Sequence, residues 1–254
     1  MIKSAALVIL LTALTGLPDQ ATAGPSGNLQ EILKGMDDLW RGRSSSGRST
    51  LEVKTGHYRR TMTMDYWSLG EDYFLVRIAA PKRERGTATL KRGDEIYNYL
   101  PKAGRVIKIG AAMMGGSWMG SHLTNDDLVQ SSRLADDYTA TLVSDKPDGK
   151  GNRTLEISLV PHKDAAVVWG KQLVQIRMPG YIPLLQKFFD EDLQPAREIR
   201  FANIRDFSGR KIPATMTVLP ANKPGEFTRF TYEQIRFDPP DLNDGFFSLK
   251  RLKQ

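Results

Sequence analysis

Residues 95–128 read EIYNYLPKAGRVIKIGAAMMGGSWMGSHLTNDDL, and three kinds of element follow one another within them. Two short runs, Ile96–Leu100 and Arg105–Ile109, flank the turn residues Pro101-Lys102-Ala103-Gly104, and this arrangement predicts a β-hairpin. A loop rich in glycine and methionine follows. Thr124 and Asp127 then form a T-x-x-D sequence, which is typical of the first turn of a helix. The stretch predicts tightly turned strands with a short helix beside them.

Alternation with a period of two continues outward from this hairpin in both directions. Successive side chains of a β-strand point to opposite faces, so apolar residues two apart line one face of a sheet. Such runs are Met62, Met64 and Tyr66; Phe74, Val76 and Ile78; Leu155, Ile157 and Leu159; Ile199 and Phe201; and Ile212, Ala214, Met216 and Val218. In the last long run, Phe230 and Tyr232 fall on one face and Phe227, Ile235 and Phe237 on the other.

Turn signals separate the strands, and helical spacing occurs in two places. Turns are predicted at residues 69–72, 91–94, 102–104, 148–151, 208–210 and 223–225, and such short connections favour antiparallel pairing. A first amphipathic helix is predicted where Leu29, Ile32, Leu33, Met36, Leu39 and Trp40 share one face, with Asn28 and Glu31 in the positions of a capping box. A second helix is predicted near 124–135. The polar run RGRSSSGRS at 41–49 is interpreted as a hinge or loop.

These elements predict a mainly β protein built on a single curved antiparallel sheet. A sheet of this length curls, and its concave face needs an apolar cover. The expected covers are the N-terminal helix, the segment near 111–135 and the sequence FFSL at 246–249. We therefore expect an open half-barrel covered by a few α-helices, with a cavity suited to apolar ligands between sheet and helices.

The N-terminus has the three parts of a cleavable export signal over residues 1–23. Lys3 is its positive region, residues 4–17 are apolar or small without charge, and Ala21-Thr22-Ala23 fits the small-x-small rule for cleavage before Gly24. The apolar run is too short to span a bilayer comfortably. We therefore expect one exported domain over residues 24–254.

The composition narrows the possible covalent modifications and binding partners. The chain has no cysteine, which excludes disulfides and the acylated cysteine of a bacterial lipoprotein. Its net charge of +7 permits contact with anionic lipid or an acidic partner. No nucleic-acid partner is expected for an exported protein.

Within residues 95–128, the pattern Y-x-Y-x-P, R-x-x-K-I, S-W-M-G-S and T-x-x-D-L resembles the LolA-like family of outer-membrane lipoprotein-sorting proteins. The resemblance extends over the chain through the opening helix, the successive strands and a short F-x-L ending. It implies an open half-barrel lidded by helices, located in the periplasm of a Gram-negative bacterium. The LolA/LolB-like superfamily includes carriers that shelter the acyl chains of lipoproteins and sensors that read mislocalised lipoproteins. Members of this branch are often found near RND-type membrane transporters.

Large apolar side chains mark the expected ligand site. Met and Trp side chains on a glycine-rich backbone suit an adaptable apolar contact, although they equally suit a plug that closes the end of the barrel. The residues that we expect to form the wall and lid of the cavity are Trp67, Tyr97, Tyr99, Met113, Met114, Trp118 and Met119. Arg105 and Lys108 are expected to contact a head group, or else to keep a strand edge in solution.

The sequence therefore predicts a periplasmic carrier that shelters a lipid or an acylated lipoprotein, in lipoprotein sorting or lipid trafficking. It would touch the membrane only transiently. The alternative is a sensor or accessory subunit of an inner-membrane RND-type transporter, with the loop at 110–121 as its docking surface.

An enzyme is the third hypothesis, and it is the weakest. His57, His122 and His162 lack metal-ligand spacing, so neither a metal site nor a cofactor is expected. Ser117, Ser121, His122, Asp126 and Asp127 are crowded as in a hydrolase, but no G-x-S-x-G elbow is present. Asp126 and Asp127 also suit a helix N-terminus, and no catalytic residue is predicted.

Overall fold

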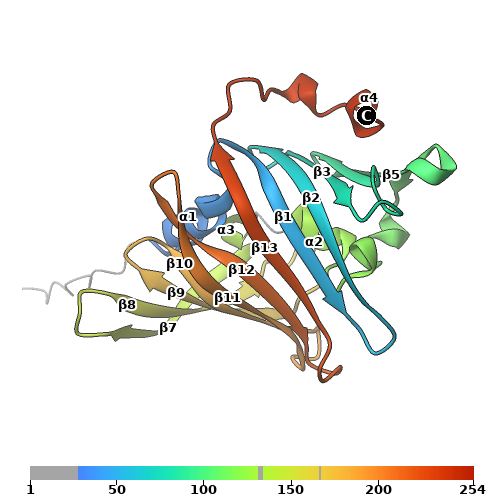
Figure 1. The fold of residues 1–254 in the computed structure, drawn as a ribbon. Helices are drawn as coiled ribbons and strands as arrows, with labels where there is room; N and C mark the ends of the chain where they lie inside the picture. Colours follow the sequence, from blue (N-terminus) through green and yellow to red (C-terminus); the bar gives the residue numbers. More distant parts are fainter. Residues whose placement is uncertain (1–27, 131–133, 166) are drawn as a thin grey trace, which may run out of the picture.

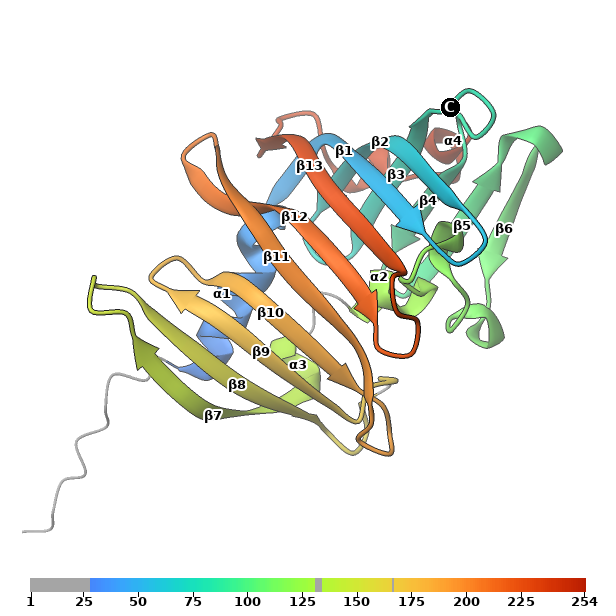
Figure 2. The same cartoon turned by 60° about the horizontal axis from the view of Figure 1, so that its bottom comes forward.

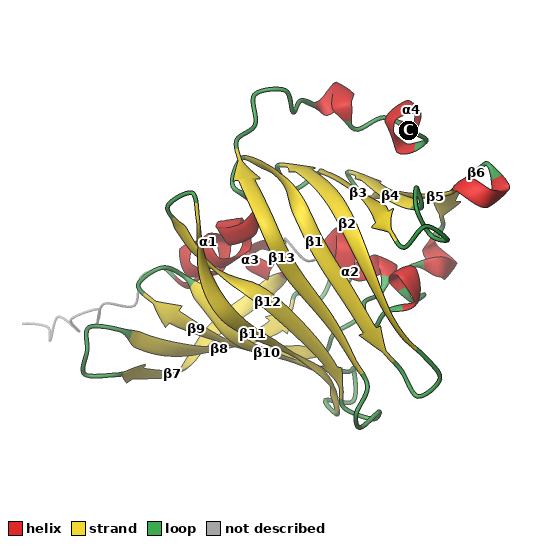
Figure 3. Cartoon of the chain, viewed as in Figure 1, coloured by secondary structure: helices red, strands yellow, loops and turns green. Residues whose placement is uncertain are grey.

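The computed structural model describes residues 28–254, apart from 131–133 and 166. The export signal predicted over residues 1–23 lies outside the described residues. In the described chain, thirteen β-strands form one antiparallel sheet, and short helices pack against it (Figures 1 and 3). This confirms the predicted fold class, a curved and open antiparallel sheet with a few helices.

The sheet has the strand order β6-β5-β4-β3-β2-β1-β13-β12-β11-β10-β9-β8-β7. Strands that follow one another in sequence are neighbours, except for β6 and β7, and β1 pairs with β13 where the two halves of the chain meet. Strands β6 and β7 are the two edges, and the sheet between them is strongly curved (Figure 2). The strands are β1 Ser44–Lys54, β2 Arg59–Leu69, β3 Tyr73–Ala80, β4 Ala88–Arg92, β5 Glu95–Leu100, β6 Arg105–Ile109, β7 Tyr138–Pro147, β8 Arg153–Pro161, β9 Lys171–Met178, β10 Ile182–Phe189, β11 Pro195–Phe207, β12 Arg210–Pro220 and β13 Phe227–Phe237.

Four α-helices accompany the sheet in the part of the chain that the structure describes. They are α1 Leu29–Arg41, α2 Asn125–Gln130, α3 Leu134–Asp137 and α4 Leu249–Leu252. The predicted N-terminal helix is confirmed as α1, and the side chain of Asn28 caps it by accepting a hydrogen bond from the Gln30 amide (3.1 Å). In the region of the helix predicted near 124–135, the structure describes α2 and α3, and residues 131–133 between them lie outside the described residues.

The concave face of the sheet carries the main apolar core. Helix α1 buries Ile32, Leu33 and Met36 against α3 and the strands β7 to β9. Near the middle of the sheet, the inward residues of β1, β2, β3 and β13 pack with Trp118 and Leu123. Helices α1, α2 and α3 lie on this side of the sheet (Figure 1).

The opposite face has a smaller core under the C-terminal segment. Phe247 and Leu252 are fully buried against Leu75 and Leu90. Along β3, Leu75 points away from the face that carries Val76 and Ile78, because neighbouring strand residues point in opposite directions. The expectation that FFSL at 246–249 covers the concave face is therefore wrong. These residues seal the convex side.

The polar run at 41–49 is also corrected by the structure. Residues 44–49 belong to β1, a central strand that pairs with β2 on one side and β13 on the other. Gly47 is required here, because a Cβ atom at this position would lie 2.0 Å from the Gln234 carbonyl oxygen. Small side chains thus mark a crowded central strand, although their polarity is typical of a loop.

One register shift changes the predicted faces of β13. Arg48 pairs with Gln234 and Ser49 with Tyr232, so Glu233 is the extra residue of a β-bulge. The bulge returns Ile235 and Phe237 to the face of Tyr232, where they pack with Ile212. The prediction that Ile235 and Phe237 lie on the opposite face is wrong for this reason.

Candidate functional site: a cavity beneath the helices

A cavity of about 320 Å³ lies between the concave face of the sheet and the helical cover. Helices α1, α2 and α3 form one side, and inward residues from both halves of the sheet form the other. Its apolar lining includes Met36, Trp40, Tyr66, Phe74, Trp118, Leu128, Leu134, Trp169, Phe188, Phe201, Met216, Phe230 and Tyr232. Its size is at the lower end of the range for small-molecule sites.

The floor of the cavity combines small residues with aromatic rings. Ser45 and Ser68 come from the adjacent strands β1 and β2, and their hydroxyl oxygens lie 2.8 Å apart. Rings of Tyr66 and Phe230 contact the ring of Tyr232, with centroids 5.6 and 4.9 Å apart. The serines leave room that large side chains would fill, while the rings make the surroundings apolar.

A bidentate ion pair crosses the cavity. Arg197 on β11 donates through Nη1 and Nη2 to the two carboxylate oxygens of Asp127 at distances of 2.7 and 2.5 Å. Its guanidinium carbon lies 4.5 Å from the ring centroid of Trp169 and 4.4 Å from that of Phe188. Such a fork is one of the stronger polar contacts in proteins. It ties the helical cover to the sheet.

Asp127 also caps the first turn of α2, as the T-x-x-D sequence predicts. Its Oδ2 accepts hydrogen bonds from the amide of Thr124 (2.7 Å) and from its hydroxyl (3.0 Å), and the Asp127 amide donates to Thr124 Oγ1 (3.2 Å). This is the reciprocal pattern of a capping box. One carboxylate therefore shapes α2 and holds it to β11.

Burial suppresses charge in the cavity lining. It raises the pKa of Asp37 to about 8, against a partial opposing effect of the Arg41 charge. Burial, together with the neighbouring Asp127 charge, raises the pKa of Asp126. It also lowers the pKa of Lys91, whose Nζ donates to the Glu71 carbonyl (2.6 Å). With a pKa of about 8, Asp37 is mostly protonated at neutral pH, and the cavity lining there carries one negative charge fewer.

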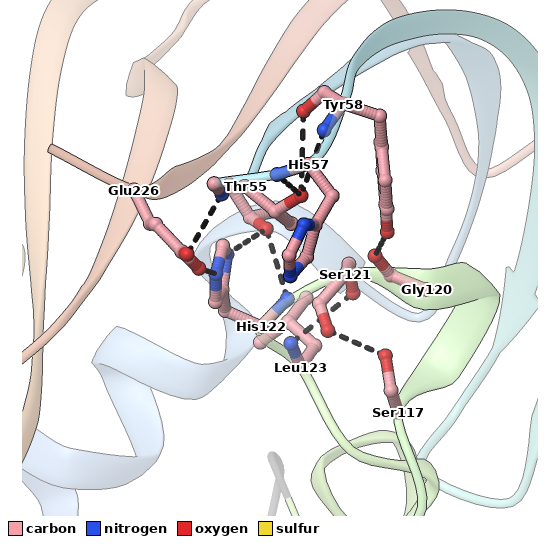
Figure 4. Close-up of polar contacts among 11 residues, drawn as sticks. Thr55, His57, Tyr58, Ser117, Gly120, Ser121, His122, Leu123 and Glu226 are labelled. Atoms are coloured by element: carbon pink, nitrogen blue, oxygen red, sulfur yellow. Dashed lines mark hydrogen bonds and ion pairs between the residues drawn. The ribbon is translucent and has the colours of Figure 1, made fainter. Parts of the chain in front are cut away.

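The segment 117–123 closes one end of the cavity and is fastened from several sides (Figure 4). The indole of Trp118 donates to Thr89 Oγ1 on β4 (3.1 Å). His122 lies between Thr228 and Glu226, with each ring nitrogen 2.9 Å from one of their oxygens. The His122 amide donates to the same Thr228 hydroxyl (2.9 Å). All three hydrogen bonds form together when the Thr228 hydroxyl donates to Nδ1 of His122 and Nε2 of His122 donates to the Glu226 carboxylate.

The serines of this segment serve its own folding. Ser121 Oγ donates to the Trp118 carbonyl (2.7 Å) and accepts from the Leu123 amide (3.1 Å), and Ser117 Oγ donates to the Ser121 carbonyl. The ring of His122 is turned toward Thr228 and Glu226 instead (Figure 4). The sequence neighbours Ser121 and His122 thus do not form a nucleophile–base pair in this arrangement.

The structure separates the seven residues predicted to line the cavity. Trp118 is in its lining. Trp67, Tyr97 and Tyr99 pack on the convex side, with Leu75, Leu90 and the C-terminal Phe246 and Phe247. Strand β2 of Trp67 does line the cavity, but the Trp67 side chain points away from it. Among the described residues, none from β5, the strand of Tyr97 and Tyr99, is in the lining. Tyr66 and Ser68, next to Trp67, face inward.

The three methionines have three different environments. Met113 is exposed, and Met114 packs against the small cluster of Ile96 and Ile109. Met119 packs at the edge of the main core. It also lines a second hollow, which lies on the side of segment 117–123 away from the cavity. That any of the seven residues contacts a ligand stays a prediction.

The two expected head-group residues lie apart from the cavity lining. Lys108 is on the edge strand β6, where it forms an ion pair with Glu95 and lies 5.9 Å from the ring centroid of Tyr97. Arg105 is exposed at the start of the same strand. Head-group contact by either residue stays a prediction.

Several lining residues were missed because they come together only through the sheet. Arg197, Trp169 and Phe188 belong to the second half of the chain, and Asp127 to the first. The only sequence signal for any of them is the T-x-x-D cap that contains Asp127. The serine run at 44–49, with its small inward residue Ser45, is a second signal that the loop interpretation discarded.

Two findings concern metal ions and membranes. Among the described residues, no group of three or more histidine, aspartate or glutamate side chains is placed to hold a metal ion. In the same part of the chain, no helix combines the length and the apolar character needed to cross a membrane.

Three solved structures resemble the chain along most of its length. A DUF1329 family protein from Desulfovibrio piger matches with a TM-score of 0.77 and 21% identity, covering 88% of this chain and 97% of the other. An outer-membrane lipoprotein-sorting protein domain from Vibrio parahaemolyticus matches with a TM-score of 0.75 and 24% identity, covering 89% and 98%. A LolA superfamily protein from Nitrosomonas europaea matches with a TM-score of 0.71 and 19% identity, covering 87% and 98%.

Sequence comparison adds one family. No curated protein matches the chain. Residues 70–254 match the model of a family described as "Uncharacterized protein". The chain therefore belongs to that family, and its open half-barrel is the fold of the LolA superfamily predicted from residues 95–128.

Proposed function

We propose that the protein is a periplasmic carrier that shelters acyl chains of a lipid or an acylated lipoprotein in the cavity of its half-barrel. The observation that carries this proposal is the cavity of about 320 Å³, which is lined mainly by apolar and aromatic side chains and closed by helices and a loop. The fold shared with a lipoprotein-sorting domain supports it. In this function the protein uses no cofactor and catalyses no reaction.

The binding energy comes from removing methylene groups from water. Each buried methylene contributes about 0.8 kcal/mol, so about ten of them supply roughly 8 kcal/mol before the losses of association. A net free energy of about 8 kcal/mol corresponds to a dissociation constant of about 1 μM, so more than ten methylenes must leave water to reach that affinity. Suppressed ionisation of Asp37 helps, because an apolar chain then shares the cavity with one charge fewer.

Loading and release require the cover to move. The cover is held to the sheet by the Arg197–Asp127 fork and by the contacts of His122 with Thr228 and Glu226. These localised polar contacts add to the apolar packing of Trp118 and Leu123 in the main core. A partner or a ligand that competes for them opens the cavity without unfolding the sheet.

Native mass spectrometry of protein released gently from the periplasm tests the carrier. We expect a co-purifying lipid or acylated peptide as an added mass. An empty protein bound stably to another polypeptide would contradict the carrier and support the sensor or accessory subunit instead.

A matched pair of variants places the ligand in the cavity. Ser45→Leu adds bulk to the cavity floor, while Ser46→Leu adds the same bulk on the other face of β1, opposite Trp67 in the register. We expect Ser45→Leu to weaken binding of a fluorescent fatty acid such as cis-parinaric acid by about tenfold, which is 1.4 kcal/mol, and Ser46→Leu to leave it unchanged. Equal affinities in both variants would place the probe elsewhere.

A further inference from the structure

A second hollow of about 520 Å³ lies on the other side of segment 117–123. Trp118 lines the apolar cavity, whereas Met119 and Gly120 line this second hollow, so a single short segment separates the two. Its floor includes Met62 and Ile78, which belong to the core of the concave face. We call it the arginine pocket, because Arg59, Arg60 and Arg83 are in its lining.

The arginine pocket has an excess of positive charge. Its lining holds three arginines and one carboxylate, that of Glu84. Arg60 and Arg83 share this carboxylate, with nitrogen–oxygen distances of 3.6 and 3.2 Å. Arg59 pairs with Glu52, which Arg229 shares. Glu52 and Arg229 are outside the lining, on the other face of β1 and β13, so the guanidinium of Arg59 is held away from the pocket. Arg60 and Arg83 with Glu84 leave one surplus positive charge in the pocket, which an anion would balance.

Guanidinium groups recognise phosphate and carboxylate through paired hydrogen bonds. Arg83 is 70% exposed, so its N–H groups are within reach of a ligand that enters from solvent. A phosphate offers more acceptor oxygens to two guanidinium groups than a carboxylate does. The volume exceeds that of a bare phosphate, and Met62, Ile78 and Met119 offer apolar surface for a group attached to it.

Arg60 links the pocket to the wall of the apolar cavity. Its Nη2 donates to the carbonyl of Met119, and Tyr58 donates to the carbonyl of Gly120 (Figure 4 shows the Tyr58 contact). Met119 has a positive φ of 49°, which is strained for a residue with a side chain. A phosphate that drew Arg60 away would release one hold on this strained segment, and the two hollows would then join.

We propose that the arginine pocket binds the phosphate group of an acylated lipid whose chain occupies the apolar cavity. This inference rests on the proposed carrier function and names its ligand class as a phosphate-bearing amphiphile. The positive pocket selects the head group, and the cavity holds the chain.

The test compares two lipids that differ only in the phosphate, lysophosphatidic acid and monoacylglycerol of the same chain. Each competes with cis-parinaric acid for the wild-type protein, and inorganic phosphate is titrated alone by calorimetry. We expect lysophosphatidic acid to compete at concentrations about tenfold lower than monoacylglycerol, because charged hydrogen bonds contribute roughly 1.5–3 kcal/mol. The advantage should shrink as salt is added.

Arg83→Gln is the decisive variant, since Arg83 is largely exposed and its ion-pair partner among the described residues is Glu84. We expect this change to reduce the phosphate advantage at least about threefold, through loss of a charged hydrogen bond. Arg236→Gln removes the same charge from an exposed position on β13 and should leave the advantage intact.

Two results would overturn the proposal. Equal competition by both lipids would show that the pocket does not read the head group, while normal binding of cis-parinaric acid would leave the carrier function in place. Binding of inorganic phosphate without any advantage for lysophosphatidic acid would make the pocket a site for free phosphate. Failure of cis-parinaric acid itself to bind would instead contradict the carrier.

Discussion

Asp37 places a titrating group in the wall of the cavity. Its pKa rises from 3.8 to about 8 in the folded protein, chiefly because burial penalises the carboxylate. At a pH between these two pKa values, Asp37 is protonated in the folded chain and ionised in the unfolded chain. Stability from this group is therefore complete below about pH 4 and declines as the pH rises to about 8, by up to about 1.4 kcal/mol per pH unit.

Asp37→Asn removes this dependence while keeping the volume of the side chain. We expect the variant to match wild type near pH 4 and to exceed it in stability above pH 8, as measured by urea unfolding across that range. The exposed Asp148 is the control, because hydrogen bonds lower its pKa and confine its effect to acid. A wild-type protein whose difference from Asp37→Asn stays constant with pH would contradict the assigned shift.

The Arg197–Asp127 fork makes a second prediction at this scale. The two side chains are 7% and 14% exposed, so losing one partner leaves the other buried and unpaired. We expect Arg197→Met to lower the free energy of unfolding by about 3–5 kcal/mol. Adding Asp127→Asn should restore part of this loss, which a double-mutant cycle by urea unfolding measures.

Arg48 and Asp65 form the matched exposed pair, with side chains 48% and 33% exposed. Arg48→Met should lower the free energy of unfolding by no more than about 1 kcal/mol. If Arg197→Met has an effect as small as this, the fork does not hold the cover to the sheet.

Among the elements, β1 is the one that joins the two halves of the molecule. Gly47 lies where β1 passes close to β13. A Cβ atom added there would be 2.0 Å from the Gln234 carbonyl oxygen and 2.9 Å from Tyr66 Oη. We expect Gly47→Ala to lower the free energy of unfolding by at least about 2 kcal/mol, because backbone must move to admit a methyl group.

Gly110→Ala is the matched control for this element. No atom lies within 4 Å of a Cβ at Gly110, and its φ of −85° suits any residue. Thermal unfolding should show little change for Gly110→Ala and a clear loss for Gly47→Ala. Equal effects would mean that β1 is not as tightly paired as its register indicates.

The elements also show where sequence reasoning succeeds. Strands with large apolar residues, such as β2 and β8, are predicted correctly because alternating burial leaves a period-two pattern. Strand β1 is missed because its inward residue at the cavity is Ser45 and its closest contact needs Gly47, both of which are typical of loops. The predicted faces of β13 are wrong beyond Glu233, because nothing in the local sequence marks the bulge there.

The candidate site is less predictable than the fold for a related reason. Which face of a strand is concave depends on how the whole sheet curls, and a shift of one residue exchanges the faces. Trp67 and Tyr66 are equally plausible wall residues in sequence, yet Tyr66 faces the cavity and Trp67 the C-terminal segment. Arg197 and Asp127 meet only across the sheet, and their separation along the chain hides the contact.

At the scale of the whole molecule, the sheet separates two apolar layers. The concave layer contains the cavity, and the convex layer lies under Phe246 and Phe247. The two layers contact opposite faces of the same strands. A substitution in one layer should therefore alter stability without reaching the ligand site in the other.

Phe247 and Phe230 test this separation as a matched pair. Phe247 is fully buried on the convex side, and Phe230 is 7% exposed in the cavity wall. Each change to alanine should lower the free energy of unfolding by about 3–5 kcal/mol. In buffer where both variants are folded, Phe230→Ala should weaken binding of cis-parinaric acid, because wall contacts with the chain are lost, and Phe247→Ala should bind it as wild type does. A loss of binding in Phe247→Ala would show that the convex layer sets the shape of the cavity, because curvature of the sheet would then carry the change from one face to the other.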